Sequence, residues 1–140
     1  MVSLSLLGIF ICLLLVCYSD IKHRKIPNYL TALAAIFCIS LSYFNNGFNE
    51  YSVIIASIVS ILLWRFGIFG AGDSKLIIAL SCAISIKSML YFFIVTLLFG
   101  GFLVVIDFLY SKIKKTKGIR TLPYGVAISF GGIFGLITSF

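Results

Sequence analysis

The chain has 140 residues, of which 61% are hydrophobic and only 11% are charged. A soluble domain of this length could not bury that much apolar surface, because small domains leave a large share of their surface in contact with solvent. The net charge of +7 would suit a nucleic-acid-binding protein. The basic residues, however, lie at the ends of apolar runs, where they suit lipid headgroups. We therefore expect a membrane protein surrounded by lipid, with no nucleic-acid partner.

The apolar runs are continuous rather than alternating, which predicts membrane-spanning helices and not strands. Pro27 suits the first turn of the second helix, where its missing N–H is not needed, and Asn45-Asn46-Gly47 predicts the end of that helix. The first run lacks the flanking charge and cleavage site of a signal peptide, so we expect it to be retained. The sequence predicts an all-α, polytopic fold in one domain, residues 1–140. Six runs are expected, at residues 2–19, 27–44, 51–64, 74–86, 88–110 and 122–140.

Lysine and arginine are distributed unevenly between the predicted loops. Loops one, three and five hold ten of these residues, whereas the opposite side holds only Lys87. The positive-inside rule therefore places the three odd-numbered loops in the cytoplasm and both termini on the non-cytoplasmic side. The ten residues are Lys22, Arg24, Lys25, Arg65, Lys75, Lys112, Lys114, Lys115, Lys117 and Arg120.

The fourth run is short for a membrane span. Its roughly 13 residues give about 20 Å of helix, against a hydrocarbon core of about 30 Å. Gly67, Gly70 and Gly72 precede it, and this spacing argues for irregular backbone. Either Lys87 snorkels to the far interface, or the glycine-rich turn is recessed below the cytoplasmic surface. The second alternative would place Asp73 in a wet pocket, because irregular backbone at membrane depth requires protein or water around it.

The chain has only four carboxylates, and two of them are expected at one membrane face. Asp20 ends the first predicted helix and Asp73 begins the fourth, whereas Glu50 belongs to an external loop and is expected to be solvated. Two facing carboxylates can share a proton, since their repulsion raises one pKa. One can then take a proton from water as it attacks a peptide carbonyl, while the other protonates the carbonyl oxygen. This chemistry requires no metal and no cofactor.

Each acid also has a purely structural interpretation. Asp20 could end a helix among lysines, and Asp73 could cap the fourth helix. Asp107, near the cytoplasmic end of the fifth helix, is explained by an ion pair with Lys112 or another loop lysine. Lys75 could tune Asp73 electrostatically, although a role in topology or snorkelling is the preferred interpretation.

The remaining polar and small residues are interpreted structurally. His23 has no serine nucleophile motif to pair with, so we interpret it as positive-inside charge or a headgroup contact. Gly131 and Gly135 have a spacing that permits close contact between helices. The cysteines lie in apolar runs without a C-x-x-C pair, which favours small buried residues over zinc ligands or a disulfide. They are Cys12, Cys17, Cys38 and Cys82.

Three motifs resemble those of the type IV prepilin peptidase family. They are Asp20 followed by Ile26-Pro27-Asn28, then Gly70-Ala71-Gly72-Asp73-Ser74-Lys75-Leu76, then Leu122-Pro123-Tyr124-Gly125-Val126-Ala127-Ile128. The resemblance covers about residues 20–131 and is greatest to the short branch that serves Flp (tight-adherence) pili. It implies that Asp20 and Asp73 are the catalytic aspartates. It also implies supporting roles for the motif residues Pro27, Asn28, Gly70, Gly72, Lys75, Pro123, Tyr124 and Gly125.

The resemblance implies an aspartic endopeptidase of the bacterial inner membrane with its active site facing the cytoplasm. Its expected substrate is a type IV or Flp prepilin or pseudopilin, cleaved after a short basic leader. Longer family members carry an amino-terminal cytoplasmic region with paired cysteines that is linked to N-methylation. This chain starts at the first predicted span, so we expect neither that region nor methyltransferase activity.

Three alternatives remain at this point. An archaeal-type preflagellin peptidase is a near relative of the same family. A non-enzymatic membrane assembly subunit would use both aspartates for topology only. A proton-coupled transporter would use them as a relay, but both acids are expected at one face and not at the bilayer midplane.

Overall fold

A computed structural model describes residues 2–45, 48–114 and 122–139 of the chain, and these residues form helices without strands. The all-α expectation is therefore confirmed for the described ranges. The helices are α1 (Val2–His23), α2 (Asn28–Asn45), α3 (Glu50–Arg65), α4 (Ala71–Ser81), α5 (Ile86–Lys114) and α6 (Tyr124–Ile137).

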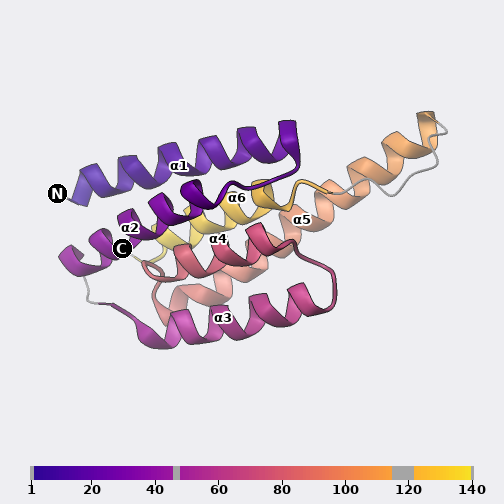
Figure 1. Ribbon diagram of the computed structural model, residues 1–140. Helices are drawn as coiled ribbons and strands as arrows, with labels where there is room; N and C mark the ends of the chain where they lie inside the picture. Colours follow the sequence, from indigo (N-terminus) through magenta and orange to yellow (C-terminus); the bar gives the residue numbers. More distant parts are fainter. Residues whose placement is uncertain (1, 46–47, 115–121, 140) are drawn as a thin grey trace.

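Each helix runs opposite to the one before it, so the chain forms an antiparallel bundle (Figure 1). The C-terminal end of α1 and the N-terminal ends of α2, α4 and α6 gather at one end of this bundle, and both chain termini lie at the other (Figure 1). The short helix α4 is central, because it packs against α2, α3 and α6. Its side chains Leu76, Ile77 and Leu80 are fully buried.

Two helices in the described part of the chain are long and apolar enough to cross a membrane, Val2–His23 and Ile86–Tyr110. In their most apolar windows only 33% and 22% of the residues are buried, so both helices turn apolar side chains outward. The core helix of a soluble protein would bury such side chains. Two shorter apolar helices, Asn28–Phe44 and Tyr124–Ile137, accompany them. The outward apolar surface suits lipid as the surrounding solvent.

The helices on either side of the glycine-rich segment begin and end at residues other than those predicted. Helix α1 continues through Asp20 to His23, so Asp20 belongs to a helix and not to the following loop. Helix α4 spans Ala71–Ser81 and not residues 74–86, because Gly70 serves as its N-cap and Asp73 accepts the Gly70 N–H. The prediction of irregular backbone up to residue 73 was therefore wrong by one helical turn.

The other boundaries differ by a few residues. Helix α2 begins after Pro27, whose carbonyl accepts backbone N–H groups of the first turn. Helix α5 includes Lys87 in its first turn, although this residue was predicted in a loop, and it extends to Lys114. Helix α6 is shorter than the predicted run 122–140. The predicted stop at Asn46-Gly47 and the basic residues Lys115, Lys117 and Arg120 lie outside the described residues.

Helices α5 and α6 approach closely at two glycines of α6. A Cβ atom on Gly131 would overlap the hydroxyl of Thr96 and lie 2.9 Å from the carbonyl oxygen of Phe92. A Cβ atom on Gly135 would lie 3.0 Å from Cβ of Phe92. The expectation that these glycines allow close helix contact is confirmed.

Candidate active site

Asp20 lies in the last turn of α1 and is only 5% exposed. Its Oδ2 atom accepts a hydrogen bond of 2.7 Å from the backbone N–H of Gly125, a residue 105 positions later in the chain. Gly125 is the second residue of α6, and the first N–H groups of a helix have no partner within it. Asp20 therefore satisfies one of these groups and faces the positive end of the α6 dipole.

Asp73 is the third residue of α4 and is half-buried. Its Oδ2 atom accepts the backbone N–H of Gly70 at 2.9 Å. The next residue, Ser74, donates its hydroxyl to the carbonyl of Ser60 in α3 at 3.2 Å. The start of α4 is thus fixed both to its own N-cap and to the neighbouring helix, and Asp73 is held in one orientation.

The segment that leads to Asp73 is turned into place at the end of α3. Gly67 adopts a left-handed conformation with φ of +72°. Its N–H donates to the carbonyl of Trp64 at 2.9 Å, and the N–H of Ile68 donates to the carbonyl of Leu63 at 3.0 Å. This pair of bonds is a Schellman motif, which favours glycine at the left-handed position. The chain then crosses from α3 to the N-cap of α4.

An aromatic contact joins this segment to α6. Phe69 is buried, and its ring lies against that of Tyr124 with the centroids 5.4 Å apart and the planes tilted by 60°. Tyr124 is the first residue of α6, directly before Gly125. The contact therefore links the residues beside Asp73 to the helix end that binds Asp20.

Ile26 lies between two glycines of different motifs. A Cβ atom on Gly72 would lie 3.1 Å from Cβ of Ile26, and a Cβ atom on Gly125 would lie 2.9 Å from its Cδ1. Both distances are shorter than ordinary van der Waals contacts between carbon atoms. The missing side chains at Gly72 and Gly125 thus let α4 and α6 close around Ile26.

The remaining motif residues lie at the edge of this cluster. Lys75 donates from Nζ to Oδ1 of Asn28 at 2.9 Å, which connects α4 to the start of α2. Pro123 is the N-cap residue of α6. Arg24, at the end of α1, has a φ of +54°, a left-handed conformation that is uncommon for a residue with a side chain. The predicted role of Lys75 in topology stays a prediction.

Asp20 and Asp73 line the same cavity, whose volume is about 730 Å³. The two carboxylates that were expected at one membrane face therefore line one cavity. Asp107 is not among the residues that line it, and its ion pair with Lys112 stays a prediction. The other lining residues are Arg24, Lys25, Ile26, Gly67, Ile68, Phe69, Gly70, Ala71, Gly72, Leu122 and Tyr124.

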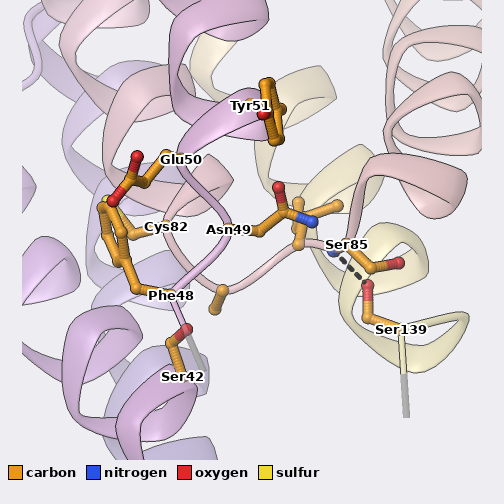
Figure 2. A pocket seen from close by; sticks show the side chains of 10 residues that line it. Ser42, Phe48, Asn49, Glu50, Tyr51, Cys82, Ser85 and Ser139 are labelled. Atoms are coloured by element: carbon orange, nitrogen blue, oxygen red, sulfur yellow. Dashed lines mark hydrogen bonds between the residues drawn. The ribbon is translucent and has the colours of Figure 1, made fainter. Parts of the chain in front are cut away.

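A second cavity, of about 340 Å³, involves the chain segments at the opposite end of the bundle. Figure 2 shows its side chains, including a hydrogen bond of 3.0 Å from the N–H of Ser85 to Oγ of Ser139. Glu50 is the one carboxylate among its lining residues, and it is exposed as expected. This cavity lacks the paired acids that the chemistry of the first one requires.

Neither the cysteines nor the histidine are among the residues that line the cavity of the paired aspartates. Cys12, Cys38 and Cys82 are buried and Cys17 is half-buried, all as free thiols. His23 is exposed at the end of α1, and its proposed role at the headgroups stays a prediction. Within the described ranges, no group of three or more potential ligand side chains is placed to hold a metal ion.

Sequence reasoning missed two contributors to the cavity. Phe69 was treated only as part of a glycine-rich stretch, although an aromatic residue among glycines is itself a signal of a fixed contact. Ile26 was recognised as a motif residue without a role. Its position between two glycines depends on contacts with two distant segments, those of Gly72 and Gly125, which no local pattern reveals.

Comparison with known proteins identifies the family. Residues 7–106 match the model of the type IV leader peptidase family, and this range includes Asp20 and Asp73. Prepilin peptidase EppA of Methanocaldococcus jannaschii is 33% identical over 85 residues, which cover 61% of this chain and 25% of that protein. Prepilin peptidase EppA of Methanococcus maripaludis is 33% identical over 72 residues, covering 51% of this chain and 20% of that protein.

The aligned part of the chain spans a quarter or less of the length of these two relatives. No solved structure gives a significant match. The family match covers 100 of the 140 residues, well over half of the chain. As the three motifs predicted, the chain belongs to the type IV leader peptidase family.

Proposed function

We propose that this chain is an aspartic endopeptidase that removes the leader of a prepilin or pseudopilin, with Asp20 and Asp73 as its catalytic pair. The observation that carries the proposal is the shared cavity, lined by both carboxylates in a chain of the leader peptidase family. Each carboxylate accepts a glycine N–H, from Gly125 or from Gly70, so both are oriented before any substrate arrives.

In the proposed reaction the pair shares one proton. The ionised carboxylate takes a proton from a water molecule, and the oxygen of that water attacks the carbonyl carbon of the scissile peptide bond. The protonated carboxyl group gives its proton to the carbonyl oxygen. The other carboxyl group, which now holds the proton taken from water, then gives it to the amine nitrogen as the C–N bond breaks, and a hydroxyl of the intermediate returns a proton to the first donor.

We propose that the six helices cross a bacterial inner membrane, with the cavity at the cytoplasmic face and both termini on the other side. The antiparallel order supports this, because Asp20, Asp73 and the basic residues Arg24 and Lys25 belong to the same end of the bundle (Figure 1). Helix α4 has 11 residues, which give only about 16 Å of helix. A helix of that length fits the membrane if the start of α4 is recessed, with Asp73 below the membrane surface, or if Lys87 snorkels to the far interface.

The substrate proposal rests on the family and on the names of its two relatives. The short Flp branch is a narrower proposal that rests on the motif resemblance alone. It predicts that the substrate is a small pilin with a short basic leader, encoded near the gene for this chain.

The test is co-expression of such a prepilin with Asp20→Asn or Asp73→Asn, which keep the size of the side chain but remove its titratable group. Each change is expected to reduce processing by at least about 100-fold, because proton transfer needs both carboxyl groups. Glu50→Gln and Asp107→Asn are the matched controls and should process normally. Undiminished processing by either catalytic variant would overturn the assignment of the pair.

A further inference from the structure

We infer that Gly125 is a positioning residue whose backbone N–H fixes the orientation of Asp20 for the reaction. The inference rests on the proposed function, which assigns catalysis to Asp20. It extends that function to a residue outside the range matched by the family model, residues 7–106.

The first step is the hydrogen bond itself. The N–H of Gly125 lies 2.7 Å from Oδ2 of Asp20, a short bond in a buried place. A bond from an N–H group to an ionised carboxylate is about twice as strong as one between neutral groups. Asp20 is 5% exposed, so water has little access to replace this donor.

The second step is the need for glycine at this position. A Cβ atom on residue 125 would lie 2.8 Å from Oδ2 of Asp20 and 2.9 Å from Cδ1 of Ile26. Both atoms are the ends of side chains, so the cheapest relief is rotation of those side chains and not movement of the backbone. Rotation of Asp20 carries its carboxylate away from the N–H group and away from its position in the cavity.

The third step follows from that relief. A substitution at residue 125 is expected to displace a reactive group while changing the packing of the fold only slightly. A displacement of about 1 Å from the productive geometry can cost about 100-fold in rate. Catalysis should therefore suffer far more than folding.

Gly132 of the same helix supplies a matched control. A Cβ atom there would lie 2.7 Å from Cδ1 of Leu80, which is again the end of a flexible side chain. Gly132→Ala thus introduces the same group into the same helix with a comparable overlap. The overlapping partner is a buried leucine of α4 and not a carboxylate.

The experiment compares wild type, Gly125→Ala, Gly132→Ala and Asp20→Asn as full-length protein in detergent, cleaving the prepilin encoded near the gene. We expect Gly125→Ala to lower kcat by about 10- to 100-fold with KM changed less than about threefold. Its thermal midpoint should stay within a few degrees of wild type. Gly132→Ala should keep kcat within about twofold of wild type, whatever its midpoint.

Two outcomes would overturn the inference while leaving the proposed function intact. In one, Asp20→Asn is inactive but Gly125→Ala keeps the kcat of wild type. In the other, Gly132→Ala loses as much activity as Gly125→Ala. Normal cleavage by Asp20→Asn would instead overturn the proposed function.

Two further measurements keep the inference testable if Gly125→Ala folds poorly or if the chosen prepilin is not cleaved. Adding Ile26→Ala removes one of the two overlaps and should restore folding. The double variant should remain well below Ile26→Ala alone in kcat, and equal activity of the two would contradict the inference. Infrared difference spectra of wild type against Asp20→Asn isolate the Asp20 carboxylate bands, which Gly125→Ala should shift and Gly132→Ala should not.

Discussion

The rings of Phe69 and Tyr124 pack together with their centroids 5.4 Å apart. Phe69 directly precedes the second motif and the N-cap of α4, and Tyr124 belongs to the third motif and begins α6. The contact therefore ties together the two helix ends that orient Asp73 and Asp20. We expect the geometry of the proposed catalytic pair to depend on it.

This dependence predicts the result of a double-mutant cycle. Phe69→Leu and Tyr124→Leu should show a coupling of about 0.5–1.5 kcal/mol in the free energy of unfolding, as aromatic pairs do. Each single change should also lower kcat in the prepilin cleavage assay.

Phe99 and Phe130 form a stacked pair with centroids 4.8 Å apart that lines no part of the cavity. A double-mutant cycle on Phe99 and Phe130 should show coupling in the free energy of unfolding but leave kcat unchanged. A loss of kcat in both cycles would contradict a specific role for Phe69 and Tyr124.

The close contact between α5 and α6 predicts the effect of a single methyl group. Gly131→Ala places a Cβ atom against the hydroxyl of Thr96 and near the carbonyl of Phe92. Because backbone is involved, the overlap cannot be relieved by side-chain rotation alone, and we expect a destabilisation of about 1–3 kcal/mol. Gly101→Ala is the control, since nothing lies within 4 Å of its added Cβ atom and alanine favours a helix. Thermal unfolding in detergent can be followed with a dye that reacts with the thiols of Cys12, Cys38 and Cys82, which are buried in the folded bundle. It should show a lower midpoint for Gly131→Ala and an equal or higher one for Gly101→Ala.

The helices themselves could be predicted from the sequence because each is a continuous apolar run. The exact start of α4 could not, because it depends on a hydrogen bond between Gly70 and Asp73 that converts a glycine-rich stretch into a first helical turn. The length of α1 was underestimated as well. The apolar run stops before Asp20, but α1 continues past it to His23, and the side chain of Asp20 accepts the N–H of Gly125.

The counts of lysine and arginine predicted that Asp20 and Asp73 lie at one end of the fold, and both line one cavity. What surrounds them was not predictable in the same way. The N–H of Gly125 reaches Asp20 across 105 positions, and a pattern of local hydrophobicity contains no information on such a contact. The third motif, which contains Gly125, could be noticed only through its resemblance to a family. That resemblance does not reveal that Gly125 contributes its backbone N–H to Asp20.

The position of Ile26 between Gly72 and Gly125 has a consequence for how this family varies. The three residues fill one volume, so a gain of a methyl group at either glycine requires a loss of volume at Ile26. In an alignment of relatives, the residues at these positions should therefore change together, with alanine or serine at one glycine accompanied by valine or alanine at position 26. Relatives that keep both glycines should retain a large branched residue at position 26, whatever pilin they process.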